Sequence, residues 1–259
     1  MGIENITSNL PLIAEVSCIC KKDIDVDTIV VGFPGPGLAG SIAAKYLSNE
    51  LNLEAVGYIR SPLIPPVAVF FEGILAYPYR IHVSSEKNIG TLIGESPCLP
   101  HAYYHIANAV LDWTDKVGVR EIVILGGFPV RTLSEEDEEH PRVFLVAEPD
   151  LRDRIKDFNL PLLQGGYISD FAGAILNEAI VRDIDGYALL VPTVPNYPDP
   201  LGASELVKTV AAMKGFKINV KPLIEDSAKI KTNLGEIAEA SHKLQNQSAV
   251  PEPRRGLYV

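Results

Sequence analysis

The sequence predicts a layered α/β/α single domain with a mostly parallel, mixed sheet, followed by a C-terminal heptad helix and a flexible tail. Short β-branched segments alternate with longer helical patterns, which favours helices packed on a largely parallel sheet. The segments Thr28–Phe33 and Glu121–Leu125 are almost entirely apolar, as expected for central strands covered on both faces. Glycine and proline gather where strands should end, at residues 32–37 and 126–129.

The individual elements follow from the same patterns. The expected strands are Ile13–Cys20, Thr28–Phe33, Ala55–Ile59, Val67–Phe71, Tyr79–Ser84, Glu121–Leu125, Val143–Ala147 and Tyr187–Val191. The expected helices are Leu38–Leu51, His101–Lys116, Pro149–Asp157, Asp170–Arg182, Leu201–Lys214 and Pro222–Gln247. The hairpin-like stretch Val67–Ile93 favours a mixed sheet over a purely parallel one. We therefore expect an α/β domain over residues 1–221, a helix over residues 222–247 and an extended tail over residues 248–259.

The charge balance bears on the kind of partner. The chain has 33 acidic and 23 basic residues, a net charge of −10 at pH 7. Such a surface repels phosphate backbones and anionic headgroups, which argues against a nucleic-acid partner and against a membrane. No apolar run approaches the roughly 20 residues that span a bilayer. The odd count of 3 cysteines favours a reducing compartment. We expect a cytoplasmic protein with no bound metal or cofactor.

The last predicted helix carries a heptad seam. Its members are Leu223, Ser227, Ile230, Leu234, Ile237, Ser241 and Leu244. A seam of this kind packs either on its own domain or on a neighbouring subunit, and the sequence leaves both arrangements open. In the second arrangement, Ile230, Leu234 and Ile237 are subunit contacts, and the apolar loop residues Leu63 and Ile64 are further candidates.

The tail after this helix ends on apolar side chains. Pro251 and Pro253 stop the helix and favour an extended chain, and residues 248–259 then reach roughly 40 Å. Burial of one large apolar side chain contributes about 1.5–3 kcal/mol. We therefore expect Leu257, Tyr258 and Val259 to occupy a pocket on this protein or on another one. A terminal carboxylate beside an apolar anchor is a known form of recognition.

A glycine-rich loop offers an alternative function. Gly35, Gly37 and Gly40 have GxGxxG spacing, follow an apolar strand and precede a helix, as in dinucleotide-binding folds. The next predicted strand ends at Arg60, a cation suited to the 2′-phosphate of NADP. Against this, Pro36 removes a backbone donor, the usual acidic ribose ligand is missing, and no GxxxxGK[ST] loop is present for Mg-ATP. The alternative is a nucleotide-binding enzyme, NAD(P)-dependent or ATP-grasp-like.

Three stretches of the body resemble a known family. They are Val30–Gly40, Gly126-Gly127-Phe128 and Tyr197–Ala203. Over about residues 10–215 the chain resembles the archaeal proteasome-assembly-chaperone family, and the heptad helix and tail follow in the same order. The final residues Leu257-Tyr258-Val259 also resemble the hydrophobic-Tyr-X motif with which proteasome activators dock.

The resemblance implies a non-catalytic homo-oligomer that engages α-subunits of the archaeal 20S proteasome, as an assembly chaperone or an ATP-independent activator. By this analogy the Val259 carboxylate pairs with a lysine in a pocket between α-subunits, while Leu257 and Tyr258 supply buried area. A single tripeptide tip binds only weakly. Several tails on one oligomer gain about 10²- to 10⁴-fold through avidity, so tail docking and self-association are expected together.

Overall fold

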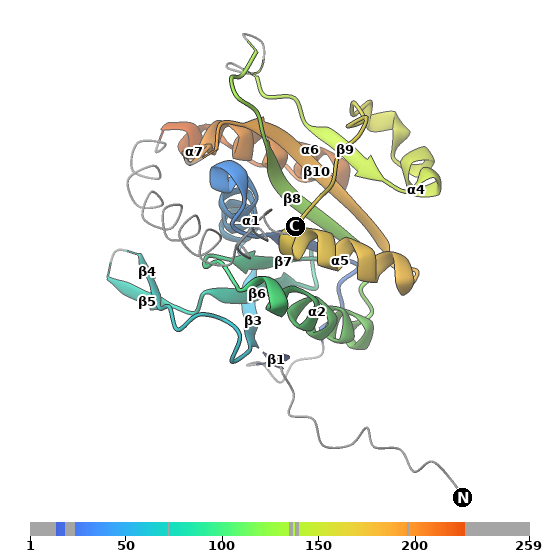
Figure 1. Cartoon of the computed structure of the whole chain (residues 1–259). Helices are drawn as coiled ribbons and strands as arrows, with labels where there is room; N and C mark the ends of the chain where they lie inside the picture. Colours follow the sequence, from blue (N-terminus) through green and yellow to red (C-terminus); the bar gives the residue numbers. More distant parts are fainter. Residues whose placement is uncertain are drawn as a thin grey trace, which may run out of the picture.

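The computed structural model describes residues 14–18, 24–71, 73–134, 137, 140–195 and 197–225. Over these ranges the chain forms three layers, with helices on both faces of an 8-stranded mixed sheet (Figure 1). The predicted fold class is confirmed. The sheet strands are β1 (Glu15–Cys18), β2 (Thr28–Gly32), β3 (Glu54–Arg60), β6 (Tyr79–Ser84), β7 (Ile89–Gly94), β8 (Glu121–Pro129), β9 (Phe144–Ala147) and β10 (Asp185–Thr193).

Helices and a separate hairpin complete the described chain. The α-helices are α1 (Ala39–Glu50), α2 (Tyr103–Val117), α4 (Pro149–Arg154), α5 (Asp170–Val181), α6 (Pro200–Lys214) and α7 (Lys221–Glu225). Short 3-10 turns are η1 (Pro36–Leu38), η2 (Pro100–Ala102) and η3 (Lys156–Phe158). Strands β4 (Val69–Phe71) and β5 (Ile74–Ala76) pair only with each other among the described strands. No helix in these ranges has both the length and the apolar character needed to cross a bilayer.

The sheet has a parallel centre and antiparallel edges. Its strand order is β1-β3-β6-β7-β2-β8-β10-β9. Strands β7, β2, β8 and β10 run parallel to one another, whereas β9 and the β1-β3-β6 side are antiparallel to their neighbours. Strand β2 is therefore a central strand, and both ends of its parallel group are shielded by further strands.

Apolar residues alternate across the sheet and form one core on each face. Along β2, Ile29 and Val31 point into the core beneath α2 and α5, and Val30 points into the core beneath α1 and α6. The same alternation along β8 places Ile124 in the first core and Leu125 in the second. Figure 1 shows the two helix layers on opposite sides of the sheet. This double burial explains why β2 and β8 are almost wholly apolar.

Several predicted elements differ from those observed. Strand β7 was missing from the expected strands because Gly90 and Thr91 interrupt its apolar pattern. A Cβ on Gly90 would lie 2.6 Å from Ile29 Cδ1 and 2.9 Å from the His82 carbonyl oxygen, so glycine suits the close approach of β7 to both neighbouring strands. The predicted helix Pro149–Asp157 is divided into α4 and η3. Of the predicted helix over residues 222–247, only the start is described, within α7.

Candidate functional site

The glycine-rich loop before α1 is tightly packed against the end of β10. Gly37 has a φ of +66°, in the left-handed region that favours glycine. A Cβ at this position would lie 2.9 Å from Thr193 Cβ and 3.1 Å from Asp199 Cβ. The Asp199 N–H donates to the Gly37 carbonyl oxygen at 2.8 Å, and the Leu38 N–H donates to the Gly35 carbonyl oxygen at 2.9 Å. The loop is thus held by its own chain on two sides.

The first turn of α1 lies directly on the backbone of β8. A Cβ on Gly40 would lie 2.1 Å from the Leu125 carbonyl oxygen, and one on Gly127 would lie 2.4 Å from the Pro36 carbonyl oxygen. A dinucleotide fold holds its pyrophosphate at the helix N-terminus. The third glycine of such a motif also serves close packing of the helix on a strand, and this is the contact that Gly40 makes with β8. Gly40 and Gly127 therefore have a packing explanation that needs no ligand, whereas Gly35 has no comparably close neighbour.

Asp199 starts α6 at the same junction. Its side chain accepts a hydrogen bond from the Gly202 N–H at 2.8 Å, the usual arrangement of an N-cap aspartate. Pro200 follows at the first helical position, where its missing N–H costs nothing. The structure thus brings together the three stretches noted in the sequence, which we call the glycine junction: the loop before α1, Gly126-Gly127 and the start of α6.

Arg60 lies away from the glycine junction. It ends β3, and the strand order places β6 and β7 between β3 and β2. Its side chain is exposed and pairs with Glu15 across the β1–β3 edge, with 3.3 Å between Arg60 Nη1 and Glu15 Oε1. Two strands, β6 and β7, therefore separate the strand that ends at Arg60 from the strand that precedes the loop. The nucleotide-binding alternative at Gly35, Gly37 and Gly40 stays a prediction.

The β4–β5 hairpin exposes a group of large apolar side chains. Phe70, Ile74 and Leu75 are 70%, 72% and 73% exposed. Phe70 and Leu75 face each other across the two strands, so they form one continuous outer surface. Val69, on the opposite face, is buried. Figure 1 shows the hairpin projecting beside the main sheet. An exposed apolar group of this size is typical of an interaction surface.

The loop before this hairpin contributes to the protein's own core. Leu63 is half-buried against the core, and Ile64 is only 9% exposed. Ile64 therefore offers little surface to another subunit, and its role as an interface residue stays a prediction. The sequence analysis expects a strand at Val67–Phe71 within a hairpin-like stretch, but it overlooks β5 and the exposed apolar surface, although residues 67–77 contain a single charged residue, Glu72. That scarcity of charge was the available signal.

A buried ionic cluster lies at the base of the hairpin. The Glu95 side chain, 3% exposed, pairs with Arg80 and with Lys45 Nζ at 2.8 Å. Lys45 Nζ also lies 3.0 Å from the centre of the Phe71 ring, a cation–π contact. Burial lowers the pKa of Lys45, and the Glu95 carboxylate opposes that shift. The cluster ties β4 to α1 and β6.

His82, next to this cluster on β6, is expected to make stability depend on pH. Burial, and then the positive charge of Arg80, lower the pKa of His82 from 6.5 to about 4. Below pH 6.5 the unfolded chain binds a proton that the folded chain does not bind. The contribution of the neutral His82 to the free energy of unfolding is therefore fully present above pH 6.5. It is lost as the pH falls towards about 4. We expect this residue to contribute a loss of about 2 kcal/mol, since it is partly exposed.

Urea unfolding at about pH 7 and about pH 4.5 measures this contribution. The His82→Asn variant should lose less stability on acidification than the parent protein does. His105→Asn, which changes an exposed histidine on α2, is the matched control. Equal acid sensitivity of the parent and His82→Asn would contradict the assignment.

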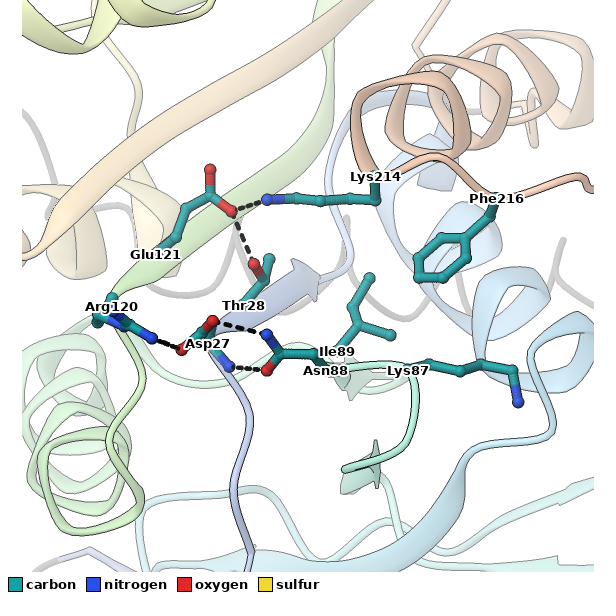
Figure 2. A pocket seen from close by; sticks show the side chains of 9 residues that line it. All are labelled: Asp27, Thr28, Lys87, Asn88, Ile89, Arg120, Glu121, Lys214 and Phe216. Atoms are coloured by element: carbon teal, nitrogen blue, oxygen red, sulfur yellow. Dashed lines mark hydrogen bonds and ion pairs between the residues drawn. The ribbon is translucent and has the colours of Figure 1, made fainter.

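A polar pocket of about 400 Å³ lies at the amino ends of β2, β7 and β8 (Figure 2). Its charged groups largely pair with one another. Asp27 accepts from the Asn88 side-chain amide at 2.6 Å and from Arg120 Nε at 2.9 Å, and these donors, Asn88 first, hold its pKa below the usual range. Glu121 accepts from Thr28 Oγ1 at 2.8 Å and pairs with Lys214. This arrangement satisfies the pocket's carboxylates without a ligand.

The remaining predicted site residues lie outside the described residues. These are Leu257, Tyr258 and Val259 of the tail, and Ile230, Leu234 and Ile237 of the heptad seam. The part of the chain that the structure describes contains no group of three or more side chains suited to holding a metal ion.

The fold and the glycine junction define a class of layered α/β domain. In this class, glycines with GxGxxG spacing let the start of α1 pack closely on β8. The pattern of the PAC2 family matches residues 29–238, so the chain belongs to the PAC2 family. It is similar to Pyrococcus furiosus PbaA, described as an archaeal homolog of proteasome-assembly chaperone, with a TM-score of 0.81 and 24% identity. That match covers 90% of this chain and 99% of PbaA.

Two further solved structures share the fold. A Thermoplasma acidophilum protein of unknown function is 30% identical, with a TM-score of 0.78 over 89% of this chain and 93% of that one. Pyrococcus furiosus PbaB, described as an archaeal proteasome activator, is 21% identical, with a TM-score of 0.73 over 86% of this chain and 98% of PbaB. The likeness to PbaA and PbaB, each under 25% identical, establishes the fold alone.

Proposed function

We propose that this protein is a non-catalytic proteasome-binding protein, of the assembly-chaperone or ATP-independent-activator type. It docks Leu257, Tyr258 and Val259 into pockets between α-subunits of the 20S proteasome. The observation that carries the proposal is the match to PbaA over nearly the whole of both chains, together with a C-terminal hydrophobic-Tyr-X sequence. The similarity to PbaB, an archaeal proteasome activator, supports the same assignment.

The chemistry of the tail supports docking at a chain terminus. The terminal carboxylate of Val259 supplies a negative charge for a lysine, and Tyr258 adds a ring and one hydroxyl. Because one such tip binds weakly, the proposal includes a homo-oligomer that presents several tails at once. Close packing accounts for Gly37, Gly40 and Gly127 of the junction, and the proposal assigns no catalytic role to these glycines.

A pull-down with purified archaeal 20S proteasome tests the proposal. Full-length protein should capture the proteasome. A chain ending at Gly256 should bind it at least about 10²-fold more weakly, because every tail of the oligomer loses its tip and the gain from avidity is lost as well. A full-length chain with Arg254→Ala and Arg255→Ala is the matched control, since it alters the tail but keeps its last three residues.

The outcomes separate the possible contacts. Equal capture by full-length protein and the truncated chain would overturn tail docking and move the contact to the body. Capture by neither would overturn 20S binding. Circular dichroism of the truncated chain should be unchanged, which shows that a loss of capture is not a loss of fold.

The runner-up is a nucleotide-binding enzyme that uses Gly35, Gly37 and Gly40. The spacing of these glycines between β2 and α1 favours it. A bound nucleotide stabilises the folded chain by RT ln(1 + [L]/Kd), so a thermal-shift measurement with NAD(P) or Mg-ATP tests it directly. We expect no shift, because Pro36 removes a backbone donor from the loop and the usual acidic ribose ligand is missing.

A further inference from the structure

The outer face of the β4–β5 hairpin has no cover among the described residues. Each strand has only 3 residues, and an isolated two-stranded hairpin is marginally stable in water. Its inner face is held by Val69 and by the contact of Phe71 with Lys45. Its outer face, with Phe70 and Leu75, offers an apolar surface to an apolar partner rather than to a charged one.

One turn of α1 connects this hairpin with the chain that leads into α7. Lys45 lies against Phe71 of the hairpin, and the next residue, Tyr46, donates its hydroxyl hydrogen bond to the Asn219 carbonyl oxygen at 2.7 Å. Consecutive side chains diverge by about 100° around a helix whose diameter is roughly 10–12 Å. The hairpin and residue 219 therefore lie on neighbouring sides of the same helical turn.

The predicted heptad seam begins on the inner side of α7. Leu223, its first member, is 3% exposed and packs in the core beneath α1 and α6. In the heptad spacing predicted from the sequence, the later seam positions share the side that carries Leu223. A helix over residues 226–247 would extend about 33 Å from this point.

We infer that the outer face of the β4–β5 hairpin is the docking surface for residues 226–247 of the same chain. Ile230, Leu234 and Ile237 cover Phe70 and Leu75, as an amphipathic helix covers an apolar groove. The segment is tethered beside the hairpin through α7, so its effective concentration exceeds that of a second copy at ordinary protein concentrations. Docking also fixes where the tail over residues 248–259 starts. The inference does not depend on what the tail binds.

Hydrogen exchange of the full-length protein tests this docking. Amides of residues 226–247 should be protected, and the paired change Phe70→Ser with Leu75→Ser should speed their exchange about tenfold or more. Exchange in β2 and α6 should be unchanged. The reciprocal variant, Leu234→Ser, should speed exchange in residues 69–76. Val181→Ser is the matched control, because Val181 is an exposed apolar residue of α5 in the opposite helix layer.

Two results would overturn the inference. One is exchange of residues 226–247 that is as fast in the parent protein as in an unfolded chain, or that the hairpin variant leaves unchanged. The other is protection that is lost on dilution, which would assign the hairpin to a second copy of the chain. If the hairpin variant also speeds exchange in β2 and α6, it has disturbed the fold. The Leu234→Ser variant then tests the docking, because its substitution lies outside the α/β domain.

Discussion

Gly40→Ala is expected to destabilise the folded protein by about 3 kcal/mol or more, one of the largest effects of any single methyl group in this chain. The added Cβ would lie 2.1 Å from the carbonyl oxygen of Leu125 and 2.8 Å from its carbonyl carbon. Both atoms belong to the backbone of β8, which pairs with β2 and with β10. Since a central strand cannot move aside, α1 would have to separate from the sheet.

The measurement is urea unfolding at neutral pH, with Gly35→Ala as the control from the same loop. A Cβ on Gly35 would meet nothing nearer than the Phe33 carbonyl oxygen at 4.0 Å, so that variant should stay within about 1 kcal/mol of the parent. Equal stability of the two alanine variants would show that the close approach of α1 to β8 is not required. A difference of the expected size would show that close packing explains Gly40 of the GxGxxG spacing.

The sequence located the parts of the fold that depend on local patterns. Strands β2 and β8 are predicted from their continuous apolar runs, because both of their faces are buried. Helices α1, α2 and α6 are predicted from helical periodicity, because burial of one helix face leaves a regular pattern. Strand β7 was missed since Gly90 is needed there for a close approach to Ile29, and that requirement comes from a neighbouring strand. Strand β4 was expected within Val67–Phe71, whereas β5, with only 3 residues, is too short to show a periodic pattern and was missed.

Sequence reasoning about the site was limited by strand order. The sequence shows that the strand after α1 ends at Arg60, but it does not show which strands lie beside β2. In the sheet, β7 and β8 occupy those neighbouring positions. Likewise, the contact of Gly37 with Thr193 and Asp199 joins segments far apart in the sequence. The tail and the heptad seam were identified from sequence alone, and their contacts stay predictions.

Replacing Glu95 is expected to have the second large effect. The Glu95 carboxylate lies between Arg80 and Lys45, and its own side chain is almost fully buried. Glu95→Gln leaves two cations in a partly dehydrated site without an anion, and breaking a buried pair in this way costs about 3–5 kcal/mol. Partial exposure of Lys45 places the expected value at the lower end of that range.

Urea unfolding compares Glu95→Gln with Glu15→Gln, which breaks the exposed pair with Arg60 and should change stability by less than about 1 kcal/mol. Similar losses in the two variants would mean that water already solvates the cluster. The double variant Glu95→Leu with Arg80→Met should recover much of the loss, because apolar side chains of similar size replace buried ion pairs well. Lys45 would keep its contact with Phe71, so the hairpin should stay on α1 in the double variant.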